Sequence, residues 1–133
     1  MLRDWDLSTD FISVIPNNGH RDLIVWQKAM GLVVLLYQAS KSFPPDERFG
    51  LTSQIRRAVI SVPVNIAEGH GRTTRGEYAN HLSVARGSLK EVETLSEIAY
   101  RLSALSGTSH DEIQALCTEI SKMLTALKRH VSR

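Results

Sequence analysis

The sequence predicts an all-α protein, an up-down bundle of four helices. Apolar residues recur at helical spacing in four successive stretches of the 133-residue chain. Turn-forming residues separate these stretches, and no stretch alternates polar and apolar residues as a half-buried strand does. The separators are Pro44-Pro45, Gly69-His70-Gly71 and Ser106-Gly107. Amphipathic helices joined by short connections are typical of an antiparallel bundle.

The composition is that of one soluble globular domain, with 42% hydrophobic and 23% charged residues. The net charge of +2 does not by itself indicate a polyanionic partner. Cys117 is the single cysteine, so no intramolecular disulfide forms, and a cytoplasmic location is expected. Asp4, Asp6 and Asp10 interrupt any signal-peptide core. The longest uncharged run, Ala29–Ser40, is too short to span a membrane.

Residues 1–20 are predicted to be an N-terminal extension, and residues 21–133 the bundle domain. The extension has no clear period but contains aromatic residues, among them Trp5 and Phe11. A turn is predicted at Pro16-Asn17-Asn18-Gly19. The aromatic residues favour packing on a surface over a mobile segment.

The first helix is predicted to begin at the N-cap Asp22 and to end near Ser42. Its predicted buried stripe consists of Leu23, Trp26, Ala29, Met30, Val33, Leu36, Tyr37 and Ser40. Val25, Leu32 and Leu35 lie off this stripe. The helix is therefore apolar around more of its circumference than a monomeric bundle needs, which indicates self-association.

The second helix is predicted to bury a face that includes Leu51, Ile55, Val59 and Ile66. Pro63 falls inside this helix, where it removes a backbone donor, so a kink is expected there. Gly69 and Gly71 are expected to supply backbone freedom at its C-terminal end.

The third helix is predicted to start with a capping box formed by Thr74 and Glu77. Its buried seam consists of Tyr78, Leu82, Ala85, Leu89, Val92, Ser96, Ala99 and Leu102, and Ser106-Gly107-Thr108 closes it. Gly87, with Ala85 and Ser88, forms a patch of small residues that predicts close approach of another subunit.

The fourth helix is predicted to start with a second capping box, Ser109 with Glu112. Its expected buried residues are Ile113, Leu116, Ile120, Met123, Leu127 and Val131. Cys117 lies beside this stripe and is expected to be inert core.

Ser61, Asn65 and Glu68 lie on one side of the second helix. We predict that they form a structural polar lock with Arg86 of the third helix, within the bundle or at a subunit contact. Carboxylate acid–base chemistry is the weaker alternative. No nucleophile–base pair, cofactor motif or Glu-x-x-His metal pair is present, so no catalytic residue, cofactor, metal or small-molecule substrate is expected.

Candidate nucleic-acid contacts are Arg56, Arg57, Arg72, Arg75 and Lys90. Arg72 and Arg75 flank the turn into the third helix, where exposed backbone N–H groups also favour phosphate. If these side chains gather on one basic rim, they would bind a nucleic-acid backbone without regard to sequence. The alternative is a solvated basic loop.

Several motifs resemble the 23S rRNA intervening-sequence protein family. They are Asp22–Gln27, Phe49–Ala58, Ser61–Gly69, and Ala85–Leu89 with Glu91 and Glu93. The resemblance is close over residues 21–105 and loose over the fourth helix, and residues 1–20 lie outside it.

This resemblance implies a small bacterial four-helix bundle that assembles into a ring, typically a pentamer. A related bundle, the accessory variability protein of diversity-generating retroelements, is a basic pentamer that works with a reverse transcriptase and nucleic acid. The expected function is therefore a non-enzymatic, ring-forming assembly or adaptor module. The alternative is an RNA- or DNA-backbone binder that works with an RNA-handling or reverse-transcriptase system.

Overall fold

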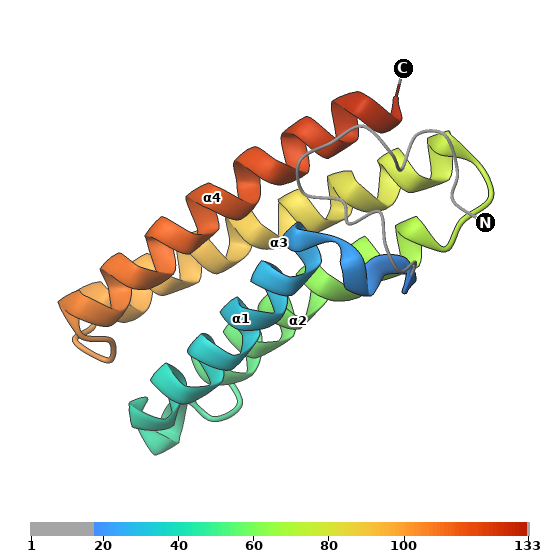
Figure 1. Ribbon diagram of the computed structural model, residues 1–133. Helices are drawn as coiled ribbons and strands as arrows, with labels where there is room; N and C mark the ends of the chain where they lie inside the picture. The colour runs from blue at the N-terminus through green and yellow to red at the C-terminus, as the bar shows by residue number, and fades with distance from the viewer. Residues whose placement is uncertain (1–17, 133) are drawn as a thin grey trace.

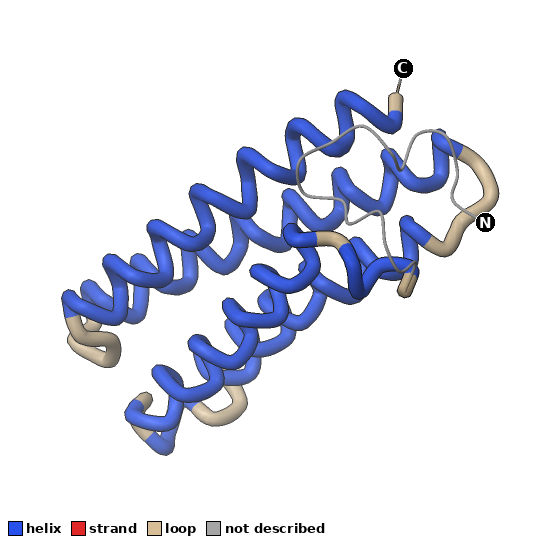
Figure 2. Tube along the Cα trace, in the orientation of Figure 1, coloured by secondary structure: helices blue, strands red, loops and turns tan. Residues whose placement is uncertain are grey.

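The computed structural model describes residues 18–132, which form four antiparallel helices (Figures 1 and 2). The helices are α1 (Ile24–Ala39), α2 (Leu51–His70), α3 (Arg75–Arg101) and α4 (Gly107–Val131). Each helix packs on two neighbours, α1 on α2 and α4, and α3 on α2 and α4, with the most extensive contact between α2 and α3. The predicted all-α four-helix bundle is confirmed. None of the described helices is long and apolar enough to cross a membrane.

Short 3-10 helices lie at the two ends of α1 and in the connection to α2. They are η2 (Gly19–Asp22), η3 (Ser40–Ser42) and η4 (Pro45–Glu47). The predicted boundary between residues 20 and 21 falls inside η2. The predicted packing of Trp5 and Phe11, and the first part of the predicted turn at Pro16, lie outside the described residues.

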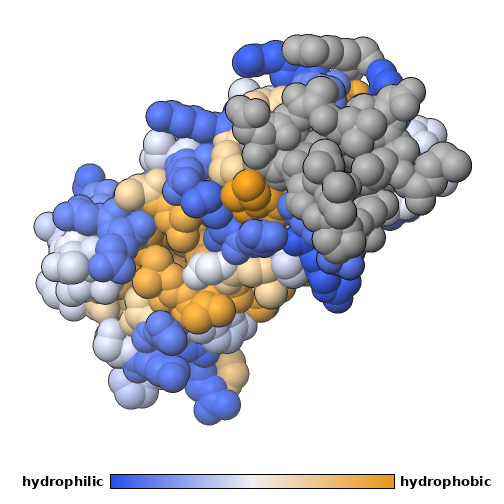
Figure 3. Space-filling view, in the orientation of Figure 1, coloured by the Kyte–Doolittle hydropathy of each residue, from blue (hydrophilic) through white to orange (hydrophobic). Residues whose placement is uncertain are grey.

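The buried face of α1 is rotated from the predicted stripe, of which Leu23, Ala29, Leu36 and Ser40 are buried. Val25, Ala29, Leu32 and Leu36 are buried, while Met30 is 41% exposed. Trp26, Val33 and Tyr37 from the predicted stripe are only partly buried. Because α1 is apolar around most of its circumference, periodicity alone could not select the face that packs on α2 and α4. Figure 3 shows apolar side chains gathered over α1 and its seam with α4.

Two predicted helix caps are wrong. The Asp22 carboxylate accepts a hydrogen bond from the Asn18 N–H (2.7 Å), so it closes the turn before α1 instead of capping that helix. Helix α4 begins at Gly107, and Ser106 accepts from the Ser109 N–H at 3.1 Å. The predicted box at Ser109 therefore lies inside the helix, because a hydroxyl three residues earlier takes the cap position.

The Thr74 cap of α3 is confirmed. Its Oγ1 accepts from the Glu77 N–H at 3.2 Å, and the hydroxyl donates to the Glu77 carboxylate at 2.9 Å. Helix α3 ends at Arg101, before the predicted Ser106–Thr108 stop. Ser103 there adopts a left-handed φ of 62°, and Leu105 returns to the core.

Helix α2 runs continuously from Leu51 to His70 with Pro63 buried inside it, and the kink at Pro63 stays a prediction. Gly69 lies within this helix and is buried. A Cβ atom at Gly69 would lie 2.7 Å from the His81 Cβ and 3.0 Å from a Tyr78 ring carbon. Gly69 therefore allows α2 and α3 to approach closely; its predicted role as a flexible exit is wrong.

Candidate functional site

A hydrogen-bonded network of side chains joins α2 to α3; we call it the α2–α3 polar network. The Ser88 hydroxyl donates to the Ser61 hydroxyl oxygen at 2.8 Å. The Asn65 amide donates to the Ser61 carbonyl (2.8 Å) and hydroxyl (3.0 Å) oxygens. His81 Nδ1 lies 3.1 Å from Asn65 Oδ1 and 3.8 Å from a Glu68 carboxylate oxygen.

The hydrogen bonds of this network determine which ring nitrogen of His81 carries a hydrogen. The Asn65 amide nitrogen donates to Ser61, so the Asn65 oxygen is left to accept. His81 Nδ1 therefore carries the hydrogen, in the neutral ring as well as in the charged one. Neither serine hydroxyl contacts the imidazole, so no nucleophile is activated, and the arrangement ties two helices together.

Arg86 does not belong to this network, contrary to the prediction. Around a helix Arg86 points about 140° away from His81 and about 160° away from Ser88, both of which face α2. The Arg86 Nε is buried and has no hydrogen-bond partner among residues 18–132. Three of the four predicted lock residues are therefore brought together, and the third helix contributes His81 and Ser88 instead of Arg86.

The sequence contained a signal for His81. His81 and Ser88 are seven residues apart, so they share one face of α3. Asn65 and Ser61 are four residues apart on α2, and the two pairs meet across the helix interface. Glu77, four residues before His81, belongs to the cap of α3.

The candidate basic residues do not gather on one rim. About 21 Å of α2 lies between Arg56 and His70, and Arg72 lies beyond that end of the helix. Arg56 is committed to the fold: its Nε donates to the Ser40 hydroxyl at 2.8 Å, and its guanidinium lies 4.5 Å from the Tyr37 ring centre. Arg72 lies 3.8 Å from the Glu77 carboxylate at the opposite end of the helix.

An apolar groove of about 330 Å³ runs between α1 and α2. Seven of its lining residues are apolar or aromatic, and the eighth is a histidine whose ring packs edge-on to Trp26. The lining residues are His20, Trp26, Met30, Val33, Ile60, Pro63, Val64 and Ala67. We call this surface the apolar α1–α2 groove.

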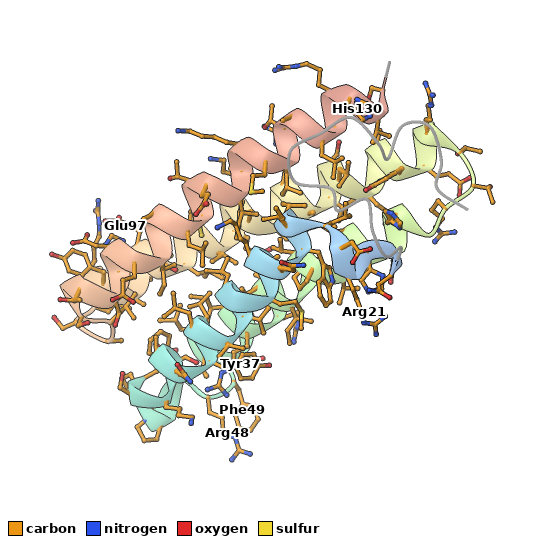
Figure 4. All side chains as sticks on the ribbon, viewed as in Figure 1. Arg21, Tyr37, Arg48, Phe49, Glu97 and His130 are labelled. Carbon is orange, nitrogen blue, oxygen red and sulfur yellow. The ribbon has the colours of Figure 1, made fainter. Side chains whose placement is uncertain are left out.

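A recess of about 490 Å³ continues from this groove at Ile60, toward the connection between α1 and α2. It combines three arginines with two aromatic rings, one of them a tyrosine, and two aliphatic hydroxyls, and no carboxylate lines it. The residues are Tyr37, Arg48, Phe49, Thr52, Ser53, Arg56, Arg57 and Ile60. Figure 4 shows Tyr37, Arg48 and Phe49 together at this end of the bundle. We call it the arginine–aromatic recess.

A third groove, of about 390 Å³, lies between α3 and α4. Its lining includes Lys90, Lys122 and Arg129, together with Glu93, whose carboxylate lies 3.1 Å from the Lys90 ammonium. Lys90 is thus separated from the other candidate basic residues and belongs to a different surface, the basic α3–α4 groove.

The predicted small-residue patch is divided among three environments. Ala85 is buried in the core, and Ser88 is bonded to Ser61. Gly87 is exposed, with nothing within 4 Å of a Cβ atom built on it. On the exposed side of α3 it lies beside Val84 (46% exposed) and on the same side as Ile98 (41% exposed). We call Val84, Gly87 and Ile98 the α3 stripe.

Burial and hydrogen bonding shift the pKa values of titratable groups in the described part of the chain. Burial and, to a smaller extent, the nearby Glu93 carboxylate raise the pKa of the Cys117 thiol to about 12, although Lys90 acts to lower it. A hydrogen bond from Arg101 lowers the pKa of Glu97, which also lies 3.3 Å from the His110 ring nitrogen. Within residues 18–132 no three His, Cys, Asp or Glu side chains are grouped to hold a metal ion.

Comparison with known structures gives the same fold. A protein with unknown function from the S23 ribosomal protein family of Bacteroides thetaiotaomicron is 24% identical and superimposes with a TM-score of 0.74. The match covers 80% of this chain and 96% of that one. No curated protein is significantly similar to the sequence.

The sequence profile of one family matches residues 21–126, which extends beyond the close resemblance over 21–105 into most of α4. The matched range contains all of the α2–α3 polar network, the apolar α1–α2 groove except His20, and the whole arginine–aromatic recess. With its four helices and this match over most of its length, the chain belongs to the 23S rRNA-intervening sequence protein family.

Proposed function

We propose that the protein is a non-enzymatic assembly or adaptor module that self-associates into a ring-shaped homo-oligomer. The observation that carries this proposal is the apolar α1–α2 groove, flanked by exposed Met30, Ile60 (39%) and Val64 (44%). Exposed apolar surface of this kind, continuous over two helices, favours burial against another protein surface. The family resemblance implies a pentamer.

A closed ring requires two different patches on each subunit, because its contacts are head-to-tail. The apolar α1–α2 groove is the first patch. The α3 stripe is the second, since Val84 and Ile98 are exposed and Gly87 leaves room for a neighbouring backbone. The two patches lie on different helices of one subunit, so each subunit can bind a neighbour on both sides.

The test is the mass of the particle in solution. Light scattering of the parent protein should give a defined multiple of the 14.8 kDa chain. Val64→Glu places a charge in the groove and should yield monomers. Leu102→Glu is the matched control, since Leu102 is exposed (62%) in the α3–α4 turn and lines neither patch. A monomeric parent would overturn the proposal.

Nucleic-acid binding is the second candidate function. The basic α3–α4 groove favours it, because Lys122 and Arg129 have no carboxylate partner among residues 18–132 and three hydroxyls lie beside them. A ring would repeat each basic surface and raise the affinity by avidity. Such a module would act beside an RNA-handling or reverse-transcriptase system. Retention of RNA should fall steeply with salt.

A further inference from the structure

The arginine–aromatic recess leaves one large apolar side chain in water. Phe49 is 87% exposed, the most exposed of the large apolar side chains among residues 18–132. It stands in the connection between α1 and α2, next to Arg48, whose guanidinium lies 5.3 Å from the Phe49 ring centre. Because Phe49 contributes little to the core, its ring is available for a contact with something outside this subunit.

Tyr37 lies across the recess from the solvent-exposed ring of Phe49. Arg56 covers the Tyr37 ring at 4.5 Å and is itself held by the Ser40 hydroxyl and by the Tyr37 carbonyl oxygen (3.3 Å). Arg56 therefore forms a fixed, positively charged floor. Its guanidinium is anchored by the fold and does not have to be ordered when a ligand binds.

Two further arginines of the recess have charges that no described carboxylate neutralises. Arg48 and Arg57 form no ion pair with a carboxylate of residues 18–132. Thr52 and Ser53 add hydroxyl donors, and the lining contains no acidic side chain. The recess thus has three positive charges, two hydroxyls and an exposed ring, which is complementary to a ligand with anionic groups and a flat aromatic surface.

We propose that this recess binds single-stranded nucleic acid, with an unpaired base stacked on Phe49 and adjacent phosphates held by Arg48 and Arg57. An exposed aromatic ring beside arginines is the arrangement with which proteins bind single strands without sequence preference. A duplex keeps its bases stacked on each other, so Phe49 could not reach a base face there. The inference rests on the second candidate function and adds to the basic α3–α4 groove a separate site, which selects the single-stranded form of nucleic acid.

The experiment measures fluorescence anisotropy of labelled oligo(U) and of an RNA duplex of equal length, with the full-length protein. The parent should bind the single strand more tightly than the duplex. Phe49→Ala should weaken single-strand binding at least fivefold and leave duplex binding unchanged. Leu102→Ala, which truncates another exposed apolar side chain (62%) in the α3–α4 turn, should change neither.

Two further variants separate stacking from charge. Phe49→Trp should retain single-strand binding, and the added indole fluorescence should be quenched when oligo(U) is titrated. Arg48→Glu with Arg57→Glu should weaken binding of the single strand and reduce its dependence on salt concentration. Light scattering of each variant should give the mass of the parent particle.

The outcomes distinguish nucleic-acid binding in general from binding at the arginine–aromatic recess. If the parent binds neither nucleic acid at low salt, the second candidate function and this site both fail. If the parent binds but Phe49→Ala binds oligo(U) equally well, nucleic-acid binding stands and the site is overturned. If Phe49→Ala instead lowers the particle mass, the Phe49 side chain packs against a second copy of the chain, and the proposed nucleic-acid site is overturned as well.

Discussion

Gly69 on α2 lies so close to His81 on α3 that a Cβ atom at Gly69 would come within 2.7 Å of the His81 Cβ. Gly69→Ala should therefore push the two helices apart and lower the free energy of unfolding by about 1–3 kcal/mol. Chemical denaturation at a fixed protein concentration measures the change.

Gly31→Ala on α1 is the control, because Gly31 lies outside both proposed contact patches. Nothing lies within 4 Å of a Cβ atom at Gly31, so the variant should gain about 1 kcal/mol from the better helix propensity of alanine. If Gly69→Ala were as harmless as Gly31→Ala, the close approach of α2 to α3 would have no energetic consequence.

The α2–α3 polar network should show coupling between Asn65 and His81. Each alanine variant removes a side chain whose partner stays half-buried, so both single changes should destabilise the fold. In a double-mutant cycle the coupling free energy should be about 0.5–3 kcal/mol, because the two side chains are in direct contact at 3.1 Å. Strictly additive effects would indicate that solvent replaces this hydrogen bond without loss.

Arg86→Met tests the absence of Arg86 from the network. Methionine keeps an aliphatic stem and removes the buried Nε that lacks a partner. The free energy of unfolding should stay within about 0.5 kcal/mol of the parent value or increase. A loss of about 3–5 kcal/mol would show instead that Arg86 neutralises a buried carboxylate.

Mixing two assembly variants distinguishes a ring from a symmetric dimer. Val64→Glu damages the apolar α1–α2 groove, and Val84→Glu damages the α3 stripe, at similar exposures of 44% and 46%. Each variant alone should be monomeric. Because each keeps one intact patch, an equimolar mixture should form heterodimers and nothing larger. Dimers of Val84→Glu alone would point to contact between two copies of the groove.

The buried Cys117 thiol should make the fold sensitive to alkali. Its pKa rises from 9.0 to about 12, so above pH 9 the unfolded chain releases this proton while the folded chain keeps it. The unfolded state then binds fewer protons, and stability falls by about 1.4 kcal/mol per pH unit between pH 9 and pH 12. Cys117→Ala lacks this loss, so its stability deficit relative to the parent should shrink over that range.

The sequence was sufficient to predict the fold because periodicity is strong in α2, α3 and α4. It failed where a helix is apolar on several faces: Leu32 is in the core of α1 and Met30 is not, which depends on packing against α2 and α4. At the candidate lock, Asn65 and Ser61 follow from spacing along one helix. Their partners on α3 could not be predicted in this way, because the rotation of α3 about its axis decides whether His81 or Arg86 faces α2.

The exposed surfaces were harder to predict than the core. From the sequence, Arg56 and Arg72 were candidates for one basic rim, but about 21 Å of α2 lies between Arg56 and His70, and Arg72 lies beyond that end. Phe49 was not among the candidates, because helical periodicity does not predict the exposure of a single side chain in a connection. Only the structure shows that this ring faces water.

The Ser61–Ser88 hydrogen bond also sets the register of α3 on α2. The buried seam of α3 repeats almost every seven residues, so a slide by one repeat, about 10.5 Å, would again bring mainly apolar residues of the seam to the interface. That slide would place Ser88 where His81 now lies and Leu95 where Ser88 now lies. Ser61 would face a hydrocarbon and Asn65 would lose its imidazole partner. The apolar core makes the two helices adhere, and the serine pair selects one of the alignments that the core alone would tolerate.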